Sequence, residues 1–240
     1  DDVLRFENSP MDMVVEEVDR FWSKKDKFSR LGVLHTRGIL LYGPPGTGKS
    51  ICLQQVVESM VARGDLVLFA KSTSAVVDGV RAVKEVEPNR KVVVVFEEVD
   101  ELCSYNERPL LQLLDGDLKV GNVLYLATTN YINKLPERML RTGRFDHKVY
   151  IGYPTFEHRL KYFKVKLQGI EDDEKKITQL AEDSDGLGFS DMREMIVGLY
   201  AMEDTMDDVR SRIPQLKDSK RDKKPRRSSS VSDSSREAIS

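Results

Sequence analysis

The chain has 240 residues, of which 40% are hydrophobic and 32% charged, with a formal net charge of −2. This length suits one sizeable core and a small second domain, and the apolar content excludes a wholly disordered chain. The two cysteines have no metal-ligand neighbours at a useful spacing, so we expect a soluble intracellular protein in a reducing compartment, most simply the cytoplasm. No apolar run approaches the ~20 residues that cross a bilayer.

The sequence predicts a helix at the start of the chain, followed by alternating strands and helices. Residues 11–28 carry apolar side chains at helical spacing, with Ser9 or Asp12 available as the N-cap. Short apolar runs predict strands buried on both faces of a parallel sheet at 38–42, 66–70, 91–96, 122–127 and 148–151. Helices are predicted between them at 49–62, 75–86, 109–114 and 134–140. The alternation predicts an α/β fold with right-handed crossovers.

After Tyr153 the pattern becomes purely helical. Helices are predicted at 156–167, 174–181 and 190–202, with a further polar helix before Pro214. The last residues lack apolar periodicity and are rich in Lys, Arg and Ser, which is typical of a disordered tail. We therefore expect an α/β domain over 1–153, a small helical domain over 154–213 and a disordered basic, serine-rich tail over 214–240.

A glycine-rich loop joins the first predicted strand to the next predicted helix. Its sequence, GPPGTGKS at 43–50, fits the pattern G-x-x-x-x-G-K-[S/T] in the strand-to-helix context that a phosphate-binding loop requires. Its glycines let backbone N–H groups turn inward at a helix N-terminus, where anions bind. We predict that Lys49 contacts the β- and γ-phosphates of ATP and that Ser50 ligates Mg²⁺. The predicted ATP-binding residues are Gly43, Pro44, Pro45, Gly46, Thr47, Gly48, Lys49 and Ser50.

Polar side chains follow two other predicted strands. The sequence FEEVD places Glu97 and Glu98 at the carboxyl end of a buried strand, where ligands of open α/β sheets bind. We assign Glu97 to the shell of Mg²⁺ and Glu98 to polarising the attacking water, with a charged surface loop as the alternative. Asn130, which follows another buried strand, is expected at the same edge, where it positions the water or contacts the γ-phosphate.

Arg141 and Arg144, in the sequence RTGRFD, lie between two apolar segments. Guanidinium groups there would neutralise charge that develops on a phosphate during its transfer, either within the chain or on a neighbour's ATP. An ordinary surface ion pair is the alternative for each arginine. Spacing alone does not decide between these roles.

Together these motifs resemble the AAA ATPases over about residues 1–210. GPPGTGKS is similar to Walker A, VVVVFEEVDEL to Walker B, ATTN to sensor 1 and LRTGRFD to the region that carries arginine fingers. The resemblance implies a five-stranded parallel sheet flanked by helices, as nucleotide-binding domain, and a C-terminal helical lid. It implies that Arg141 and Arg144 act in trans on the ATP of an adjacent subunit. It further implies a homo-oligomeric ring, most often a hexamer, that remodels a protein or protein complex.

Some segments resemble one branch of that family, the mitochondrial respiratory complex III assembly ATPases. They are RGILLYGPPGTGKS, LLQLLDG, TTNYINKL and VYIGYP. This branch also tends to have Glu where Glu97 stands, whereas most of the family has Asp. Residues 72–80, STSAVVDGV, fall where many members of the family carry an aromatic residue followed by glycine in a substrate-gripping pore loop, but here the aromatic residue is missing, which leaves Val77 or Val80 to line a pore.

Two other functions stay open at this point. Arg193, in GFSDMREM, falls where loader-like relatives keep a sensor 2 arginine facing the γ-phosphate, and with the basic tail it fits a nucleic-acid-associated loader or helicase-accessory ATPase. Glu97 and the missing aromatic residue fit a weakly hydrolysing, nucleotide-gated scaffold. The three histidines are predicted at the surface or in loops, and Phe21 and Trp22 as core anchors.

Overall fold

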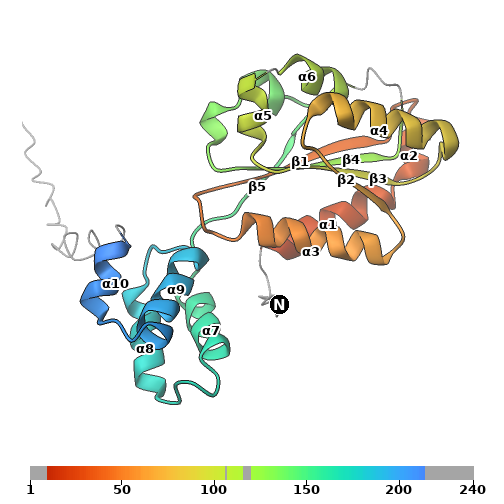
Figure 1. Ribbon diagram of the computed structural model, residues 1–240. Helices are drawn as coiled ribbons and strands as arrows, with labels where there is room; N and C mark the ends of the chain where they lie inside the picture. The colour runs from red at the N-terminus through yellow and green to blue at the C-terminus, as the bar shows by residue number, and fades with distance from the viewer. Residues whose placement is uncertain (1–9, 106, 116–119, 214–240) are drawn as a thin grey trace, which may run out of the picture.

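Five parallel strands form one sheet in the computed structural model, which describes residues 10–105, 107–115 and 120–213 (Figure 1). The strands are β1 (Thr36–Tyr42), β2 (Leu66–Phe69), β3 (Val92–Phe96), β4 (Val123–Thr129) and β5 (His147–Tyr150). Their order across the sheet is β2-β3-β4-β1-β5, and every neighbouring pair is parallel. The predicted α/β class and five-stranded parallel sheet are therefore confirmed.

Helices cover both faces of this sheet (Figure 1). The helices α1 (Pro10–Trp22) and α3 (Lys49–Ala62) lie on one face, while α4 (Thr73–Val86), α5 (Val99–Tyr105) and α6 (Arg108–Leu114) lie on the other. Successive side chains of β3 point to opposite faces of the sheet and pack against the helices on each face. Val93 and Val95 pack in the cluster that includes α1 and α3, whereas Val94 and Phe96 pack in the cluster that includes α4 and α6. A strand with two buried faces explains the unbroken apolar run VVVVF.

Three helical predictions differ from the structure in detail. The helix predicted over 11–28 is divided into α1 and α2 (Lys25–Arg30), where the Ser23 hydroxyl donates a hydrogen bond to the Arg20 carbonyl, 2.9 Å away. The segment 134–140 forms two 3-10 turns, Ile132–Lys134 and Glu137–Leu140, instead of one helix. Pro136 separates them because proline has no N–H and holds the preceding residue in an extended conformation. Helix α5 was not predicted.

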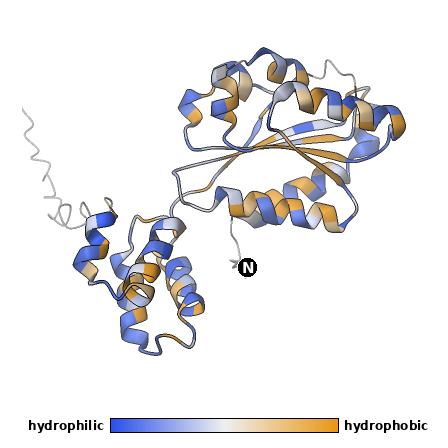
Figure 2. Ribbon diagram, viewed as in Figure 1, coloured by the Kyte–Doolittle hydropathy of each residue, from blue (hydrophilic) through white to orange (hydrophobic). Residues whose placement is uncertain are grey.

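The helices after the sheet surround a core of their own. They are α7 (Phe156–Lys166), α8 (Glu174–Asp183), α9 (Phe189–Ile196), a π turn (Val197–Ala201) and α10 (Met206–Arg212). Figure 2 shows hydrophobic residues concentrated along the strands, while the helices carry both hydrophobic and hydrophilic residues. No helix in the described part of the chain is long and apolar enough to cross a membrane. The tail predicted over 214–240 lies outside the described residues.

A cluster of buried polar side chains, His35, Lys84 and Asn122, lies at the amino ends of β1 and β4, away from the carboxyl edge of the sheet. His35 lies in the loop before β1, which agrees with the prediction of a surface or loop position, but it is only 5% exposed and stacks on Phe21, with ring centroids 4.0 Å apart. Phe21 and Trp22 are buried, as predicted. The His35 ring lies 3.1 Å from Asn122 Oδ1, and the Asn122 carbonyl accepts a hydrogen bond from the buried Lys84 ammonium. Burial lowers the pKa of Lys84 to about 8.

Lys84 should make stability depend on pH in a defined window. Below about pH 8 this lysine is charged in both the folded and the unfolded chain, but between pH 8 and its ordinary pKa of 10.5 only the unfolded chain holds the proton. The free energy of unfolding of wild type, relative to Lys84→Met, should therefore rise with pH across this window by roughly 1 kcal/mol per pH unit. Urea unfolding of both proteins at pH 8 and pH 10 measures this difference. A difference that does not change with pH would contradict the burial of this ammonium.

Candidate functional site

Three chain segments meet at the carboxyl edge of the sheet. The glycine-rich loop follows β1, Glu97 and Glu98 follow β3, and Asn130 follows β4. β1 pairs with β4 over its whole length, from Thr36 with Val123 to Tyr42 with Thr129, and β4 pairs with β3. Because all these strands are parallel and in register, their ends lie together, which is where open α/β sheets bind ligands.

The glycine-rich loop depends on backbone conformations that favour glycine. Gly43, Gly46 and Gly48 have φ angles of 153°, 74° and 97°. A Cβ atom at Gly43 would also overlap the backbone carbonyl of Ile151, just after β5. The Thr47 hydroxyl donates to the Pro44 carbonyl, 2.9 Å away, across the loop. The loop is thus fixed both by its own turn and by the strand beside it, and it leads directly into the N-terminus of α3.

The buried ammonium of Lys49 lies inside this loop. It donates hydrogen bonds to the carbonyls of Gly43, at 2.9 Å, and Pro44, at 2.6 Å. Burial lowers the pKa of Lys49, and the nearby carboxylates of Glu98 and Asp100 partly oppose this shift. Carbonyl oxygens satisfy the N–H donors but do not neutralise the charge. An anion bound in the loop would neutralise the charge of Lys49. The helix N-terminus at the same place favours phosphate as that anion.

Glu98 is held in a strained backbone conformation at the end of β3. Its φ angle is 48°, a left-handed value that is uncommon for a residue with a side chain. Its N–H donates to the Thr128 hydroxyl at 3.1 Å, and its carboxylate accepts a hydrogen bond from the Asn130 side chain at 3.4 Å. The strain therefore serves to direct one carboxylate toward the amide at the end of the neighbouring strand.

Two threonine hydroxyls support this arrangement, and sequence reasoning missed them. Thr128 accepts the Glu98 N–H, while Thr129 donates to Asp100 at 2.6 Å and accepts from the N–H of Tyr131 at 3.0 Å. Both threonines are buried. The signal was present in the sequence, because two hydroxyl side chains at the end of a buried apolar strand must find hydrogen-bond partners.

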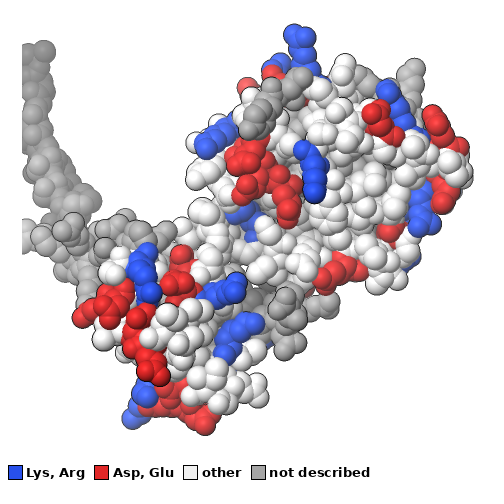
Figure 3. All heavy atoms as spheres, in the orientation of Figure 1, with Lys and Arg blue, Asp and Glu red and all other residues white. Residues whose placement is uncertain are grey.

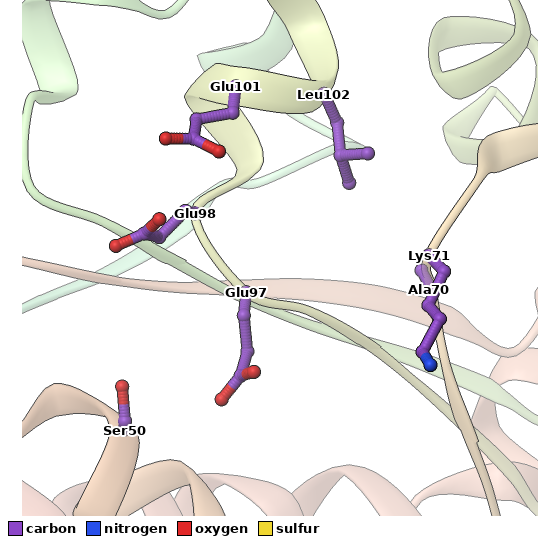
Figure 4. A pocket seen from close by; sticks show the side chains of 7 residues that line it. All are labelled: Ser50, Ala70, Lys71, Glu97, Glu98, Glu101 and Leu102. Atoms are coloured by element: carbon purple, nitrogen blue, oxygen red, sulfur yellow. The ribbon is translucent and has the colours of Figure 1, made fainter.

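Ser50 and Glu97 lie on opposite sides of a cavity of about 450 Å³, and Figure 4 shows the Glu97 carboxylate directed toward Ser50. Acidic side chains gather on the same face of the molecule, over α5 (Figure 3). A hydroxyl and a carboxylate are the oxygen ligands that Mg²⁺ accepts, and this ion usually completes its shell with water and substrate phosphates. No cluster of three or more metal-binding side chains occurs among the described residues. The pair therefore fits a Mg²⁺ ion that arrives with a nucleotide.

A larger cavity, of about 1170 Å³, lies between the glycine-rich loop and the helices that follow the sheet. The N-terminus of α9 closes one side of it, where the Phe189 N–H donates to the Gly46 carbonyl at 2.7 Å. The Phe189 ring packs beside Gly48, and Ser190 lies against Gly46. The cavity is large enough for a nucleotide. Its phosphate end is thus in direct contact with the helical part of the chain.

The structure brings most of the predicted site residues together. Residues 45–50 line the larger cavity, and so do Glu98, Asn130 and Arg193. Glu97 and Ser50 line the smaller one. Arg193 lines the larger cavity from α9, and its side chain is exposed.

Arg141 and Arg144 line neither cavity of their own chain. Arg144 donates to both carboxylate oxygens of Asp115, at 2.5 and 2.6 Å, and to the Arg138 carbonyl. The Arg141 side chain is exposed and makes no ion pair with a described residue. The two arginines therefore differ: Arg144 is held within the chain, and Arg141 is available to another molecule.

The fold and the site define a P-loop nucleotide-binding protein. Comparison with known families makes this specific, because residues 39–153 match the family described as "ATPase family associated with various cellular activities (AAA)". Residues 39–153 of this chain therefore form an AAA domain.

Curated relatives match beyond the AAA core. Protein CdcH of Halobacterium salinarum is 31% identical over 82% of this chain, and the proteasome-activating nucleotidase of Sulfurisphaera tokodaii is 31% identical over 69%. The ATP-dependent zinc metalloprotease YME1L of Drosophila melanogaster is 33% identical over 76% of this chain. The matched parts make up 29%, 47% and 27% of these relatives. The chain thus spans less than half the length of each.

Gly188 should be needed for the contact between α9 and the loop. A Cβ atom at this position would lie 2.6 Å from the Gly46 carbonyl oxygen, so Gly188→Ala must push the two backbones apart. We expect about a ten-fold loss of ATP affinity, measured by calorimetry, with a thermal midpoint within a few degrees of wild type. Gly79→Ala is the matched control, since a Cβ in the middle of α4 meets only an ordinary contact with Leu68. Equal ATP affinity in the two variants would show that the contact is not important for binding.

Proposed function

We propose that the chain hydrolyses Mg²⁺–ATP as one subunit of a homo-oligomeric ring, most simply a hexamer, and uses the hydrolysis to remodel a protein or protein complex. The observation that carries the proposal is the Glu98 carboxylate, which is held by strained backbone beside Asn130 at the mouth of the phosphate-binding loop. A site that only bound nucleotide would have no use for an oriented carboxylate at this place.

Each residue has a distinct task in this proposal. Bound Mg²⁺–ATP supplies the phosphoanhydride bond to be broken and a metal charge that offsets that of the phosphates. Lys49 turns from the carbonyls of Gly43 and Pro44 to the phosphates, and Ser50 with Glu97 provides oxygen ligands for the metal. Glu98 orients the attacking water and takes its proton, and Asn130 holds the carboxylate or the water in place. Arg193 adds positive charge from the lid, for which we propose residues 154–213.

A ring is supported by the different surroundings of the two arginines. Arg144 is fixed by Asp115 and Arg138, whereas the neighbouring Arg141 side chain projects without an ion-pair partner among the described residues. A free guanidinium close to a fixed one suits a finger that completes a neighbour's site. We therefore propose that Arg141 contacts the neighbour's ATP and that Arg144 supports the loop that carries it.

A protein as substrate is supported by the names of two relatives, a proteasome-activating nucleotidase and an ATP-dependent metalloprotease. The way of gripping it differs from an aromatic pore loop. Only residues 70–72 join β2 to α4, and Ser72 already caps that helix through a hydrogen bond from Ala75 N–H. Val80 is fully buried in the core, so its predicted place at a pore was wrong, and Val77 packs against the same core. We therefore propose that the protein substrate is remodelled without an aromatic pore-loop residue to grip it.

The two rival functions have less support. Arg193 lines the nucleotide cavity, so ATP accounts for it without any nucleic acid. On the face shown in Figure 3, Lys and Arg are interspersed with Asp and Glu instead of forming a basic stripe. The basic tail lies outside the described residues. A weakly hydrolysing scaffold is distinguished from the main proposal by its negligible turnover.

Within the family, we propose the mitochondrial respiratory complex III assembly ATPases as the branch to which this chain is related. The support is the sequence similarity of RGILLYGPPGTGKS, LLQLLDG, TTNYINKL and VYIGYP, together with Glu97. The placement of Glu97 opposite Ser50 is compatible with a glutamate as metal ligand.

Glu98→Gln should separate binding from hydrolysis. The amide keeps the size of the side chain but cannot take a proton from water, so ATP affinity should stay within about three-fold of wild type while turnover falls by at least about 100-fold. Steady-state phosphate release and calorimetry measure the two quantities. Glu85→Gln, at an exposed position on α4, should behave as wild type. Retained turnover in Glu98→Gln would overturn the assignment of the base.

Arg141→Ala should abolish the dependence of ATP turnover on ring assembly without preventing the assembly itself. If the finger acts in trans, the turnover per subunit of wild type rises with protein concentration as rings form, and Arg141→Ala assembles equally well but loses this rise, with a 10³-fold or larger defect. Mass photometry and ATPase assays on the same samples test both points. Arg81→Ala, at an exposed position on α4, is the control. A rate that depends on neither concentration nor Arg141 would contradict the ring.

A further inference from the structure

The turn that carries Arg141 packs against β1 at a position where a side chain has no room. A Cβ atom at Gly38 would lie 2.3 Å from the carbonyl oxygen of Arg144 and 3.0 Å from the ring of Phe145. The φ angle of Gly38 is not in the left-handed region. Glycine is therefore needed here for the close approach of another backbone segment, and not for its own conformation.

Backbone hydrogen bonds connect this contact to Arg141. The Arg144 N–H donates to the Arg141 carbonyl at 3.1 Å, which closes a turn over residues 141–144. The next residue, Phe145, is fully buried, and its N–H donates to the Met139 carbonyl at 3.2 Å. The backbone of the turn is thus fixed on the side that faces the core.

The side chain of Arg144 fixes the same turn from outside the core. Its guanidinium donates to both carboxylate oxygens of Asp115, the residue after α6, and to the Arg138 carbonyl. The Arg141 side chain, three residues earlier, is exposed. The turn is therefore held through the backbone and the side chain of Arg144, while Arg141 projects from it.

The phosphate-binding loop lies at the other end of the same strand. Gly43 follows Gly38 by five residues, and a rise of about 3.3 Å per residue puts the two roughly 16 Å apart. β5 runs beside β1 between these points, and the Ile151 carbonyl packs on Gly43 as the Arg144 carbonyl packs on Gly38. A shift of the turn at Gly38 should therefore move Arg141 and leave the chain's own contacts to ATP in place.

We propose that Gly38 and Asp115 are positioning residues for the reaction of a neighbouring subunit, because they hold the turn 141–144 so that Arg141 reaches the neighbour's ATP. This inference rests on the proposed ring with a finger that acts in trans, and it names the residues that direct the finger. Gly38→Ala must push the Arg144 carbonyl away from β1, since non-bonded carbon and oxygen atoms do not approach to 2.3 Å. A misplacement of about 1 Å can cost roughly 100-fold in rate.

Mixed rings separate the subunit that donates the finger from the subunit that holds the ATP. Glu98→Gln subunits donate a normal finger but lack the base, whereas Arg141→Ala subunits keep the base but lack the finger. Each variant alone should be nearly inactive. In an equal mixture about one quarter of the interfaces combine an intact site with an intact finger, so turnover should return. Phosphate release and mass photometry on the same samples measure turnover and assembly.

Gly38→Ala should lower turnover on one side of the interface only. Added to the Glu98→Gln subunit, it should reduce the restored turnover by roughly 100-fold, because the finger that this subunit donates is misplaced. Added to the Arg141→Ala subunit, which has no finger to misplace, it should leave the restored turnover unchanged. That second mixture also shows that the Gly38→Ala subunit folds, binds ATP and enters the ring.

Two further variants make the test specific. Asp115→Asn, at an exposed side chain, should show the same one-sided effect with about a ten-fold loss, because one charged partner of Arg144 is removed. Gly121→Ala, just before β4, is the matched control for Gly38→Ala, since a Cβ there meets only ordinary contacts with His35. It should leave the restored turnover unchanged in either subunit.

The outcomes that would overturn the inference are distinct. Restored turnover that is unchanged by Gly38→Ala and Asp115→Asn in the Glu98→Gln subunit would show that these residues do not direct the finger. An equal loss on both sides of the interface would show a role in general stability only. If Gly38→Ala subunits do not enter the ring, the presence or absence of the one-sided effect of Asp115→Asn decides. If the equal mixture of Glu98→Gln and Arg141→Ala restores no turnover, the proposed ring fails and the inference fails with it.

Discussion

The buried ammonium of Lys49 is the charge around which the site is arranged. In the absence of an anion it is stabilised by two loop carbonyls, and the carboxylates of Glu98 and Asp100 act on it from the end of β3. This arrangement requires the ends of β1 and β3 to lie at the same edge, which the parallel pairing through β4 ensures. The three strands, the glycine-rich loop and the acidic strand end therefore form one functional unit, and binding of a triphosphate would satisfy its central charge.

The helical part of the chain contacts this unit at the phosphate-binding loop. The hydrogen bond from Phe189 to Gly46 joins the start of α9 to the middle of the phosphate-binding loop, and Arg193 extends from the same helix into the cavity. A movement of Gly46 on nucleotide binding or hydrolysis would therefore be passed to the start of α9 through this hydrogen bond. This short connection offers a direct route from chemistry at the phosphates to movement of the helices, without a longer chain of contacts.

Much of this could be predicted from the sequence, because the signals were local. Apolar runs with two buried faces identified the strands, and the order of glycine, lysine and serine identified the loop; both follow from short-range chemistry. What could not be predicted depends on tertiary contacts. The burial of His35 and Val80 arises from packing between distant segments, the pairing of Arg144 with Asp115 joins residues 29 apart, and the support of Glu98 by Thr128 crosses two strands.

The most direct test of the central claim is an experimentally determined structure of Glu98→Gln with Mg²⁺ and ATP. We expect the triphosphate on residues 43–50, the Lys49 ammonium moved from the carbonyls of Gly43 and Pro44 to phosphate oxygens, and the metal between Ser50 and residue 97. A nucleotide bound elsewhere, or a Lys49 that keeps its two carbonyl partners beside a bound triphosphate, would contradict that claim.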